Sequence, residues 1–234
     1  MGEIKVKKVG MKAIAVIPAY NDGKHVGAVV RGAVRYVDEV IAVDDGSRDS
    51  TGIVADKAGA NVIRLAENRG QGYATRIGVE RALKLGAGWI VLLDADGQHP
   101  PDKIPELLGK LGKGYDFVFT VRKRDAEMPV MRRFGNWFLT LAACILTGLS
   151  ISDSQSGFKA FTADAYRKMK LTSDRYGVCS EMAFEASRNG LKYCEVEIPT
   201  IYKNGRERHG TTFFDGVRIF FFMVGMGLRR MRMD

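Results

Sequence analysis

Cysteine is scarce in this chain, and its spacing carries no metal-binding pattern. The 234 residues include three cysteines, Cys144, Cys179 and Cys194. An odd number of widely separated cysteines argues against a disulfide framework and against a cysteine zinc site, so we expect reduced, partly buried thiols. The chain also lacks a charged leader followed by an apolar core and a cleavage site. We therefore expect it to stay on the cytoplasmic side of the membrane.

Two common glycine-rich nucleotide motifs are missing. A dinucleotide site needs Gly-x-Gly-x-x-Gly directly after the first strand, whereas residues 18–22 read Pro-Ala-Tyr-Asn-Asp. No stretch has the Gly-x-x-x-x-Gly-Lys-Ser/Thr spacing of a P-loop. The sequence therefore argues against both of these nucleotide sites.

Acidic residues are outnumbered by basic ones. The 36 Lys and Arg residues against 27 Asp and Glu residues give a net charge of +9. The basic residues gather at 5–12, 122–133, 203–209 and 229–232. None of these clusters has the aromatic interleaving or the motif of a nucleic-acid reader. We expect no nucleic-acid partner, and we expect the phosphates of small molecules and lipids instead.

No apolar run clearly reaches the length of a membrane span. Residues 134–151 carry no charge but number only about eighteen, the lower limit for crossing a bilayer. We expect a buried helix there, or one that lies at the lipid surface. Residues 219–228 are shorter, rich in Phe and Met, and flanked by basic residues. They suit either a membrane anchor that lies at the surface or an ordinary helix packed on the core.

Apolar segments of strand length alternate with segments of helical spacing. With 46% hydrophobic residues, the chain is long enough for one sizeable core. The expected strands are 13–18, 39–43, 61–65 and 89–93, and the expected helices between them are 24–35, 51–58 and 73–85. This alternation predicts an α/β fold with a mostly parallel central sheet flanked by helices. Acids and glycine-rich turns should then meet at the carboxyl ends of the strands, where such folds bind ligands.

Asp94 and Asp96 directly follow the strand expected at 89–93. Residues i and i+2 of an extended chain point to the same side, so both carboxylates should lie at the ligand-binding end of the sheet. One or two carboxylates, completed by water and substrate phosphates, are what Mg²⁺ or Mn²⁺ usually takes. An isolated Asp-x-Asp is also common in solvated turns, so the rest of the chain has to decide.

Four motifs occur in order at the ends of the expected strands. They are the Pro-Ala-Tyr-Asn-Asp of 18–22, the Asp-Asp-Gly-Ser of 44–47, the Asn-x-Gly-x-Gly-x-Ala of 68–74 and the Asp-Ala-Asp-Gly-Gln-His-Pro of 94–100. Together they resemble the inverting nucleotide-sugar glycosyltransferases of family 2, which have the GT-A fold. The resemblance is strongest to the dolichyl-phosphate mannose synthase-like, polyprenyl-phosphate glycosyltransferase branch, and it covers roughly 13–212. It implies a catalytic domain at 1–212, followed at 213–234 by a basic, aromatic helix that we expect to contact the membrane peripherally.

The resemblance assigns residues to the nucleotide-sugar donor. The donor-binding residues it implies are Pro18, Ala19, Tyr20, Asp22, Asp44, Gly70, Gly72, Asp94, Ala95, Gln98, Arg122, Arg206 and Arg208. Asp96 and Gln98 would hold Mg²⁺ or Mn²⁺. The two glycines would let the backbone close on the nucleotide, although they could equally serve helix entry alone. Asp22 stands where the nearest family members carry Glu, so the donor stays open: GDP-mannose is favoured, with UDP-glucose or UDP-N-acetylglucosamine behind it.

The second half of the chain supplies the acceptor side of the resemblance. Residues 152–161 resemble the family's Asp-x-x-Ser-Gly-Phe-Lys segment, which lines the active site in relatives. Asp153 and Gln155 are the candidate active-site residues in this segment. The implied catalytic residues are Asp96, Asp153, Glu181 and Arg133, and the implied acceptor-phosphate residues are Arg133, Lys203, Arg208 and, less directly, Arg206.

The acceptor decides whether a base is needed. A sugar hydroxyl would need Asp153 or Glu181 as a base. A lipid monophosphate is already ionised at neutral pH, since its second pKa is about 6.

These expectations describe a metal-dependent transfer of sugar from a nucleotide to polyprenyl (dolichyl) phosphate, at the cytoplasmic face of a membrane. A transferase acting on a sugar hydroxyl is the first alternative. A non-catalytic nucleotide-sugar-binding or membrane-scaffolding protein is the second, and the intact Asp94, Asp96 and Gln98 argue against it.

Overall fold

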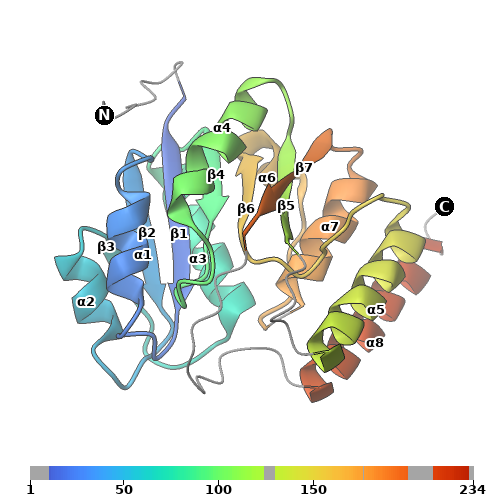
Figure 1. Cartoon of the computed structure of the whole chain (residues 1–234), viewed down its shortest axis with the longest axis horizontal. Helices are drawn as coiled ribbons and strands as arrows, with labels where there is room; N and C mark the ends of the chain where they lie inside the picture. Colours follow the sequence, from blue (N-terminus) through green and yellow to red (C-terminus); the bar gives the residue numbers. More distant parts are fainter. Residues whose placement is uncertain (1–10, 124–129, 176, 200–212, 232–234) are drawn as a thin grey trace.

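A computed structural model describes residues 11–123, 130–175, 177–199 and 213–231 (Figure 1). Within these ranges, 130–134, 213–215, 217 and 228–231 are described by their backbone alone. The three cysteines are free and partly buried, as the sequence predicts.

The centre of the molecule is a seven-stranded sheet. Its strands are β1 (Ala13–Ala19), β2 (Glu39–Asp44), β3 (Asn61–Arg64), β4 (Trp89–Leu92), β5 (Phe117–Arg122), β6 (Lys159–Thr162) and β7 (Tyr193–Ile198). They lie in the order β3-β2-β1-β4-β6-β5-β7, and β6 runs antiparallel to both neighbours while the other pairs are parallel. The predicted α/β fold with a mostly parallel sheet is confirmed.

Helices cover both faces of this sheet (Figure 1). They are α1 (Val26–Ala33), α2 (Thr51–Lys57), α3 (Gln71–Lys84), α4 (Ile104–Gly112), α5 (Val130–Thr147), α6 (Ala163–Lys168), α7 (Val178–Arg188) and α8 (Phe213–Met231), with a short 3₁₀ helix at Pro101–Lys103. The helices expected at 24–35, 51–58 and 73–85 correspond to α1, α2 and α3, with ends that differ by one or two residues.

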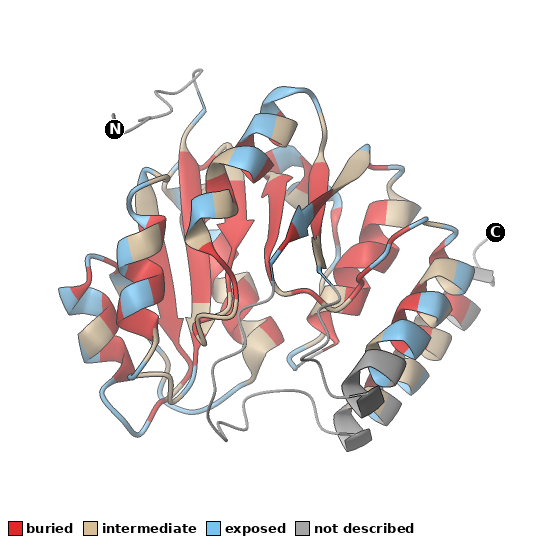
Figure 2. Cartoon of the chain, viewed as in Figure 1, coloured by how far each residue is buried: buried red, intermediate tan, exposed pale blue. Residues whose placement is uncertain are grey.

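The central strands are buried on both sides because their side chains alternate between two apolar clusters, whereas β3 and β7 at the edges are more exposed. In β1, Ile14 and Val16 join a cluster with α3, α5 and α7, whereas Ala15 and Ile17 join one with α1 and α4. Figure 2 shows the strands as a buried layer between the helices. A shift of one residue would exchange the two sets, so the register is strongly fixed. The acids at the ends of β2 and β4 therefore lie at defined positions relative to the sheet.

Helices α5 and α8 lie side by side at one end of the molecule (Figure 1). The rings of Phe138 in α5 and Phe220 in α8 are 5.1 Å apart, and Met223 of α8 is buried in the core. The large apolar side chains that this pair exposes are Trp137, Phe138, Leu141, Ile145 and Phe221. Helix α5 is thus buried on one side and open on the other. Among the residues described, no helix combines the length and the apolarity that crossing a bilayer requires.

Candidate active site

Three acidic side chains of the predicted site lie at the carboxyl ends of two parallel strands. Asp44 is the last residue of β2, and Asp94 and Asp96 follow β4. Strand β1, which ends at Ala19, lies between these two strands. Since carboxyl ends of parallel strands meet at one side of a sheet, these acids and the turn after β1 line the same part of the molecule.

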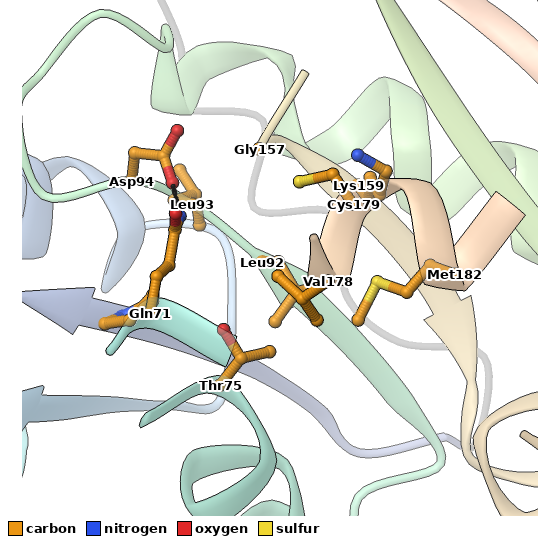
Figure 3. Close-up of a pocket in the computed structure, with 11 residues that line it drawn as sticks. Gln71, Thr75, Leu92, Leu93, Asp94, Gly157, Lys159, Val178, Cys179 and Met182 are labelled. Carbon is orange, nitrogen blue, oxygen red and sulfur yellow. Dashed lines mark hydrogen bonds between the residues drawn. The ribbon is translucent and has the colours of Figure 1, made fainter. Parts of the chain in front are cut away.

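Asp94 is held by partners from three different segments. The side-chain amide of Gln71, in the first turn of α3, donates to Asp94 Oδ1 over 2.7 Å (Figure 3). A Cβ atom built on Gly157 would lie 2.2 Å from Asp94 Oδ2, so the carboxylate rests directly on the backbone of this glycine. The backbone N–H of Asp94 donates to His99 Nδ1 over 3.4 Å. The carboxylate therefore has a defined direction.

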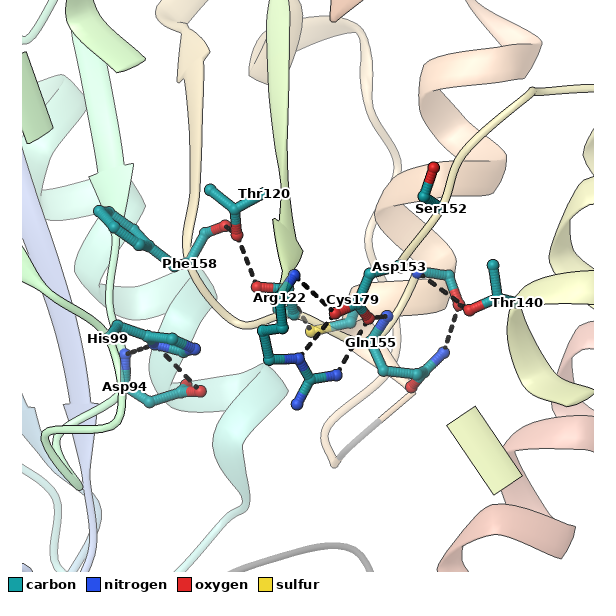
Figure 4. A network of polar contacts seen from close by, with 12 residues as sticks. Asp94, His99, Thr120, Arg122, Thr140, Ser152, Asp153, Gln155, Phe158 and Cys179 are labelled. Atoms are coloured by element: carbon teal, nitrogen blue, oxygen red, sulfur yellow. Dashed lines mark hydrogen bonds and ion pairs between the residues drawn. The ribbon is translucent and has the colours of Figure 1, made fainter. Parts of the chain in front are cut away.

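His99 is a buried, neutral partner of the Asp94 backbone. Its Nδ1 accepts the Asp94 amide, so its proton lies on Nε2. Burial lowers the pKa of His99 to about 4, which leaves the ring uncharged at neutral pH. The ring packs against Phe158, with 5.6 Å between the ring centres (Figure 4). His99 belongs to the motif at 94–100, but the sequence alone gave no reason to assign it a partner.

A buried lysine and a small cavity lie behind Asp94 (Figure 3). The side chain of Lys159 is fully buried, and its Nζ donates to the carbonyl of Ser156. Together with Asp94 and Cys179 it lines a cavity of about 10 Å³, close to the space that one water molecule needs. The positive charge of Lys159 acts on Asp94. The cavity is far too small for a substrate, and the effect of Lys159 on Asp94 is electrostatic: its charge opposes the rise in pKa that burial causes.

The carboxylates of Asp94 and Asp96 influence one another. Burial raises the pKa of Asp94, against the opposing effect of Lys159 and Arg122. Burial also raises the pKa of Asp96, and the nearby charge of Asp94 raises it further. Asp96 Oδ1 accepts the backbone N–H of Gln98 over 2.9 Å, which closes the turn. A positive charge bound here would favour the ionised forms of both acids.

The donor set in this turn fits Mg²⁺ or Mn²⁺. In the part of the chain that the structure describes, no three His, Cys, Asp or Glu side chains converge to hold a metal on their own. Two carboxylates and the amide oxygen of Gln98 are hard ligands, and these cations commonly complete such a partial set with water and phosphate oxygens. Ala95, between the two acids, is buried and can contribute only its backbone.

Asp44 has a buried carboxylate oxygen that accepts no hydrogen bond from the described residues. The side chain is 1% exposed, and its Oδ1 accepts the backbone N–H of Ser47 over 2.9 Å. Its Oδ2 has no hydrogen-bond partner among the described residues, although Arg64 Nε lies 3.5 Å away. A buried oxygen without a donor is costly unless a ligand supplies one.

The turn after β1 is fastened to the loop after β2. Asn21 has a φ of 54°, and its backbone N–H donates to Ser47 Oγ while its side-chain oxygen accepts the N–H of Arg48. The N–H of Asp22 donates to Thr51 Oγ1 over 2.8 Å. Pro18 and Ala19 end β1, and Tyr20 exposes its side chain next to them. The predicted donor turn is thus one rigid unit with Asp44.

Arg122 and Asp153 form a bidentate ion pair (Figure 4). Arg122 Nε donates to Asp153 Oδ2 over 2.6 Å, and Nη2 donates to Oδ1 over 3.0 Å. Burial opposes ionisation of Asp153, yet Arg122 holds the pKa of this carboxyl below its ordinary value. Arg122 also acts electrostatically on Asp94. Asp153 therefore fixes the direction of a guanidinium whose charge acts on Asp94, while the ion pair as a whole is neutral.

Sequence comparison identifies the family. Residues 14–187 match the protein family described as Glycosyl transferase family 2. The chain belongs to glycosyl transferase family 2. The predicted family is therefore confirmed, and the chain is a glycosyltransferase.

Relatives of this family 2 transferase are named for lipid phosphates. It is 34% identical to the UDP-N-acetylglucosamine–dolichyl-phosphate N-acetylglucosaminyltransferase of Methanococcus voltae, over 91% of this chain and 95% of the relative. It is 32% identical to the undecaprenyl-phosphate mannosyltransferase of Micrococcus luteus, over 80% of this chain and 83% of the relative. These names agree with the polyprenyl-phosphate branch that the motifs predict.

A solved structure shares the fold. Glucosyl-3-phosphoglycerate synthase of Mycobacterium tuberculosis, in complex with Mn²⁺ and UDP-glucose, superposes with a TM-score of 0.76 over 97% of this chain and 82% of its own. The sequence identity is 22%, so the likeness concerns the fold. The GT-A fold predicted from the motifs is confirmed.

Three predicted residues of the family 2 site, Gly70, Gly72 and Glu181, lie against the chain's own backbone. Gly70 and Gly72 face Asp174 and Ser173, where added Cβ atoms would lie 2.4 Å and 2.1 Å from the carbonyl oxygens. The close approach they permit in this structure is therefore that of residues 173–174. The carboxylate of Glu181 likewise accepts hydrogen bonds from residues 172–173. These contacts occupy both carboxylate oxygens of Glu181.

Some predicted residues of the family 2 site cannot be placed. Lys203, Arg206 and Arg208 lie outside the described residues. Arg133 belongs to α5, but its side chain also lies outside the described part. Gln155 is placed, and its amide donates to the hydroxyls of Ser154 and Ser180.

Proposed function

We propose that this family 2 transferase moves a sugar from a nucleoside diphosphate sugar to a polyprenyl phosphate, with inversion at the anomeric carbon. The observation that carries the donor half is the meeting of Asp44, Asp94 and Asp96 at the carboxyl ends of β2 and β4. The names of the relatives from Methanococcus voltae and Micrococcus luteus support the acceptor half.

Asp44 is the proposed contact for the nucleobase, because its Oδ2 accepts no hydrogen bond from the described residues. Its Oδ2 can accept an N–H group, which both guanine and uracil present on their ring. GDP-mannose is the donor favoured by the sequence, and UDP-glucose and UDP-N-acetylglucosamine are the other two candidates. The Methanococcus voltae relative is named for UDP-N-acetylglucosamine, so this donor belongs in any test.

A divalent cation, Mg²⁺ or Mn²⁺, would be held by Asp96 and Gln98 with support from Asp94. When bound, it would stabilise the negative charge that develops on the departing nucleoside diphosphate. The residues of the chain orient this part of the site: Gln71 and Gly157 fix the direction of Asp94, and the turn at Asp96 is closed by its own backbone. Arg122 adds a fixed positive charge beside them.

The carboxylates of Asp153 and Glu181 are both used in contacts within the protein, which favours an acceptor that needs no base. Asp153 is tied to Arg122, and both oxygens of Glu181 accept hydrogen bonds from the backbone or hydroxyls of residues 172–173. A sugar hydroxyl would require an available carboxylate to remove its proton. A lipid monophosphate arrives ionised and can attack directly. These contacts therefore support polyprenyl phosphate over a sugar hydroxyl.

The exposed face of α5 and α8 would bring the enzyme to its lipid acceptor at the cytoplasmic face of a membrane. Ile145 is 72% exposed and Phe221 67%, and Trp137 lies on the same helix pair at 46%. The described helices contain no span, so the contact we propose is peripheral. Aromatic and aliphatic side chains of this kind insert into the headgroup region of a bilayer.

Transfer of radiolabelled sugar into organic-extractable product tests the reaction. Each of the three nucleotide sugars is incubated with dolichyl phosphate and Mn²⁺ or Mg²⁺, using wild type, Asp96→Ala and the matched variant Asp102→Ala, which changes an exposed acid nearby. We expect one donor to label the lipid with wild type and Asp102→Ala but not with Asp96→Ala. Donor binding without lipid labelling from any donor would refute the polyprenyl-phosphate proposal.

Vesicle flotation tests the membrane contact. Wild type should float with vesicles that contain anionic lipid, and Ile145→Gln with Phe221→Gln should reduce the bound fraction several-fold because it removes apolar area from the surface. Ile53→Gln is the control, since Ile53 is also an exposed apolar residue, 55% exposed on α2 and outside the α5–α8 pair. Equal flotation of the double variant and the control would contradict the proposed face.

A further inference from the structure

Glu181 is a buried acid whose carboxylate is fully occupied within the protein. The residue is 3% exposed. One oxygen accepts the backbone N–H and the hydroxyl of Thr172, over 2.8 Å and 2.7 Å, and the other accepts the N–H of Ser173 over 2.9 Å. A carboxylate that accepts three hydrogen bonds from one short segment fixes that segment. We call residues 172–175 the strap.

The strap lies directly against the first turns of α3. The N–H of Tyr73 donates to the carbonyl of Asp174 over 3.1 Å, and Arg76 donates to the carbonyl of Ser173 over 2.5 Å. The guanidinium of Arg76 also pairs with the carboxylate of Asp174. Gly72 leaves no spare room, since an added Cβ would lie 2.1 Å from the Ser173 oxygen. Any displacement of the strap would therefore reach α3.

The same turn of α3 carries the residue that orients Asp94. Gln71 precedes Gly72 in the chain and donates to Asp94 Oδ1 over 2.7 Å. On its other side, the turn is held by Asp45, whose carboxylate accepts the N–H groups of Arg69 and Gly70 over 2.8 Å each. The start of α3 is thus fixed between Asp45 and the strap. Only the strap depends on Glu181.

We infer that Glu181 is a positioning residue: by holding the strap it holds Gln71 against Asp94, and it takes no proton from the acceptor. The effect of Glu181 on turnover rests on the proposed function. The path of contacts from Glu181 through the strap to Gln71 does not. This assignment differs from the catalytic role that the motif alone predicts for Glu181. It also gives the buried acid a task in a transferase whose acceptor is already ionised.

Hydrogen exchange tests the path without any substrate. In Glu181→Gln the side chain keeps its size, but an amide nitrogen then faces one of the donors of the strap. In Arg76→Met the strap loses its side-chain contacts from α3 but keeps the backbone hydrogen bond from Tyr73. We expect both changes to raise amide exchange at 71–74 about tenfold, the effect of losing one good hydrogen bond. Glu185→Gln is the matched control, because this acid lies one turn further along α7 and binds the N–H of residue 170, outside the strap.

Turnover supplies the second measurement. With the donor that wild type uses, Glu181→Gln should lower kcat about tenfold with an unchanged pH profile, and adding Arg76→Met should cost less than the product of the single effects because both act through one strap. Faster exchange confined to the strap, with 71–74 unchanged, would overturn the inference. So would loss of one limb of the pH profile, which is the mark of a base. If wild type transfers no sugar to lipid, the proposed function fails, and the exchange result still decides the path.

Discussion

Replacing Gly157 with alanine should disturb Asp94 specifically. The backbone of Gly157 lies outside the left-handed region, so alanine can adopt its conformation. The obstacle is steric, because the new Cβ would lie 2.2 Å and 2.5 Å from the two carboxylate oxygens of Asp94. Overpacking of this kind costs about 1–3 kcal/mol of unfolding free energy. Relief of the clash requires a shift of the Asp94 carboxylate, which would disturb its hydrogen bond with Gln71.

The stability cost should depend on the presence of the Asp94 side chain. In an Asp94→Ala background the space is empty, so Gly157→Ala should cost less than about 0.5 kcal/mol, the ordinary range for a substitution without a clash. Urea unfolding of wild type, both single variants and the double variant measures this coupling. Gly109→Ala is the control, since nothing lies within 4 Å of its Cβ position in α4. This control should be neutral or slightly stabilising.

Turnover should fall more steeply than stability. A displacement of about 1 Å in a positioned group costs on the order of 100-fold in rate, so Gly157→Ala should lower kcat by that order while Gly109→Ala leaves it unchanged. An equal stability cost of Gly157→Ala in the wild-type and Asp94→Ala backgrounds would refute the steric reasoning. Full activity of Gly157→Ala would show that the direction of Asp94 is unimportant.

Three further predictions concern the partners of the site. Gln71→Leu removes the hydrogen bond to Asp94 at similar volume, and it should weaken binding of Mn²⁺ with nucleoside diphosphate about tenfold in calorimetry; unchanged affinity would contradict this role. The pKa of Asp153 is lower in the folded state than its value of about 3.9 in the unfolded chain. The ionised carboxylate therefore contributes its full stabilisation above the unfolded pKa, and this contribution is lost as the pH falls through the folded pKa. Wild type should therefore lose stability more steeply than Asp153→Asn below about pH 4, and identical slopes in urea titrations would count against the ion pair with Arg122. His99→Phe leaves the N–H of Asp94 without an acceptor, and it should cost about 1 kcal/mol at pH 7; a variant as stable as wild type would refute the bond.

The sequence predicts the first half of the fold well because pattern and position agree there. Residues 13–93 alternate buried apolar strands with helices, and each strand ends in turn-forming residues or acids. The antiparallel strand β6 has no such signal. It is four residues long and begins with Lys159, a charged residue that is fully buried in the folded chain. Strand β7 lies at the edge of the sheet and mixes acidic with apolar residues. Both are decided by tertiary contacts, which outweigh local preference.

The partners of Asp94 illustrate what a sequence motif leaves out. The motif at 94–100 locates the carboxylates, but Gln71 and Gly157 stand 23 residues before and 63 residues after Asp94 in the chain. Their contact depends on the order of β1, β4 and β6 in the sheet, which no local pattern encodes. His99 lies only five residues from Asp94, but its burial and its bond to the Asp94 backbone follow from the folded structure and not from the motif.

The glycines and the acid of the family motifs acquire a common explanation from the structure. Gly70 and Gly72 are needed where residues 173–174 approach α3, and Glu181 is needed where the same segment approaches α7. A motif residue need not touch a ligand to be required by the chemistry, since a position one contact away fixes the group that does. An enzyme whose acceptor brings its own negative charge has more use for an accurately held carboxylate than for a base. On this reasoning, substitutions along the strap should alter metal and nucleotide binding at Asp94 before they alter anything at the acceptor.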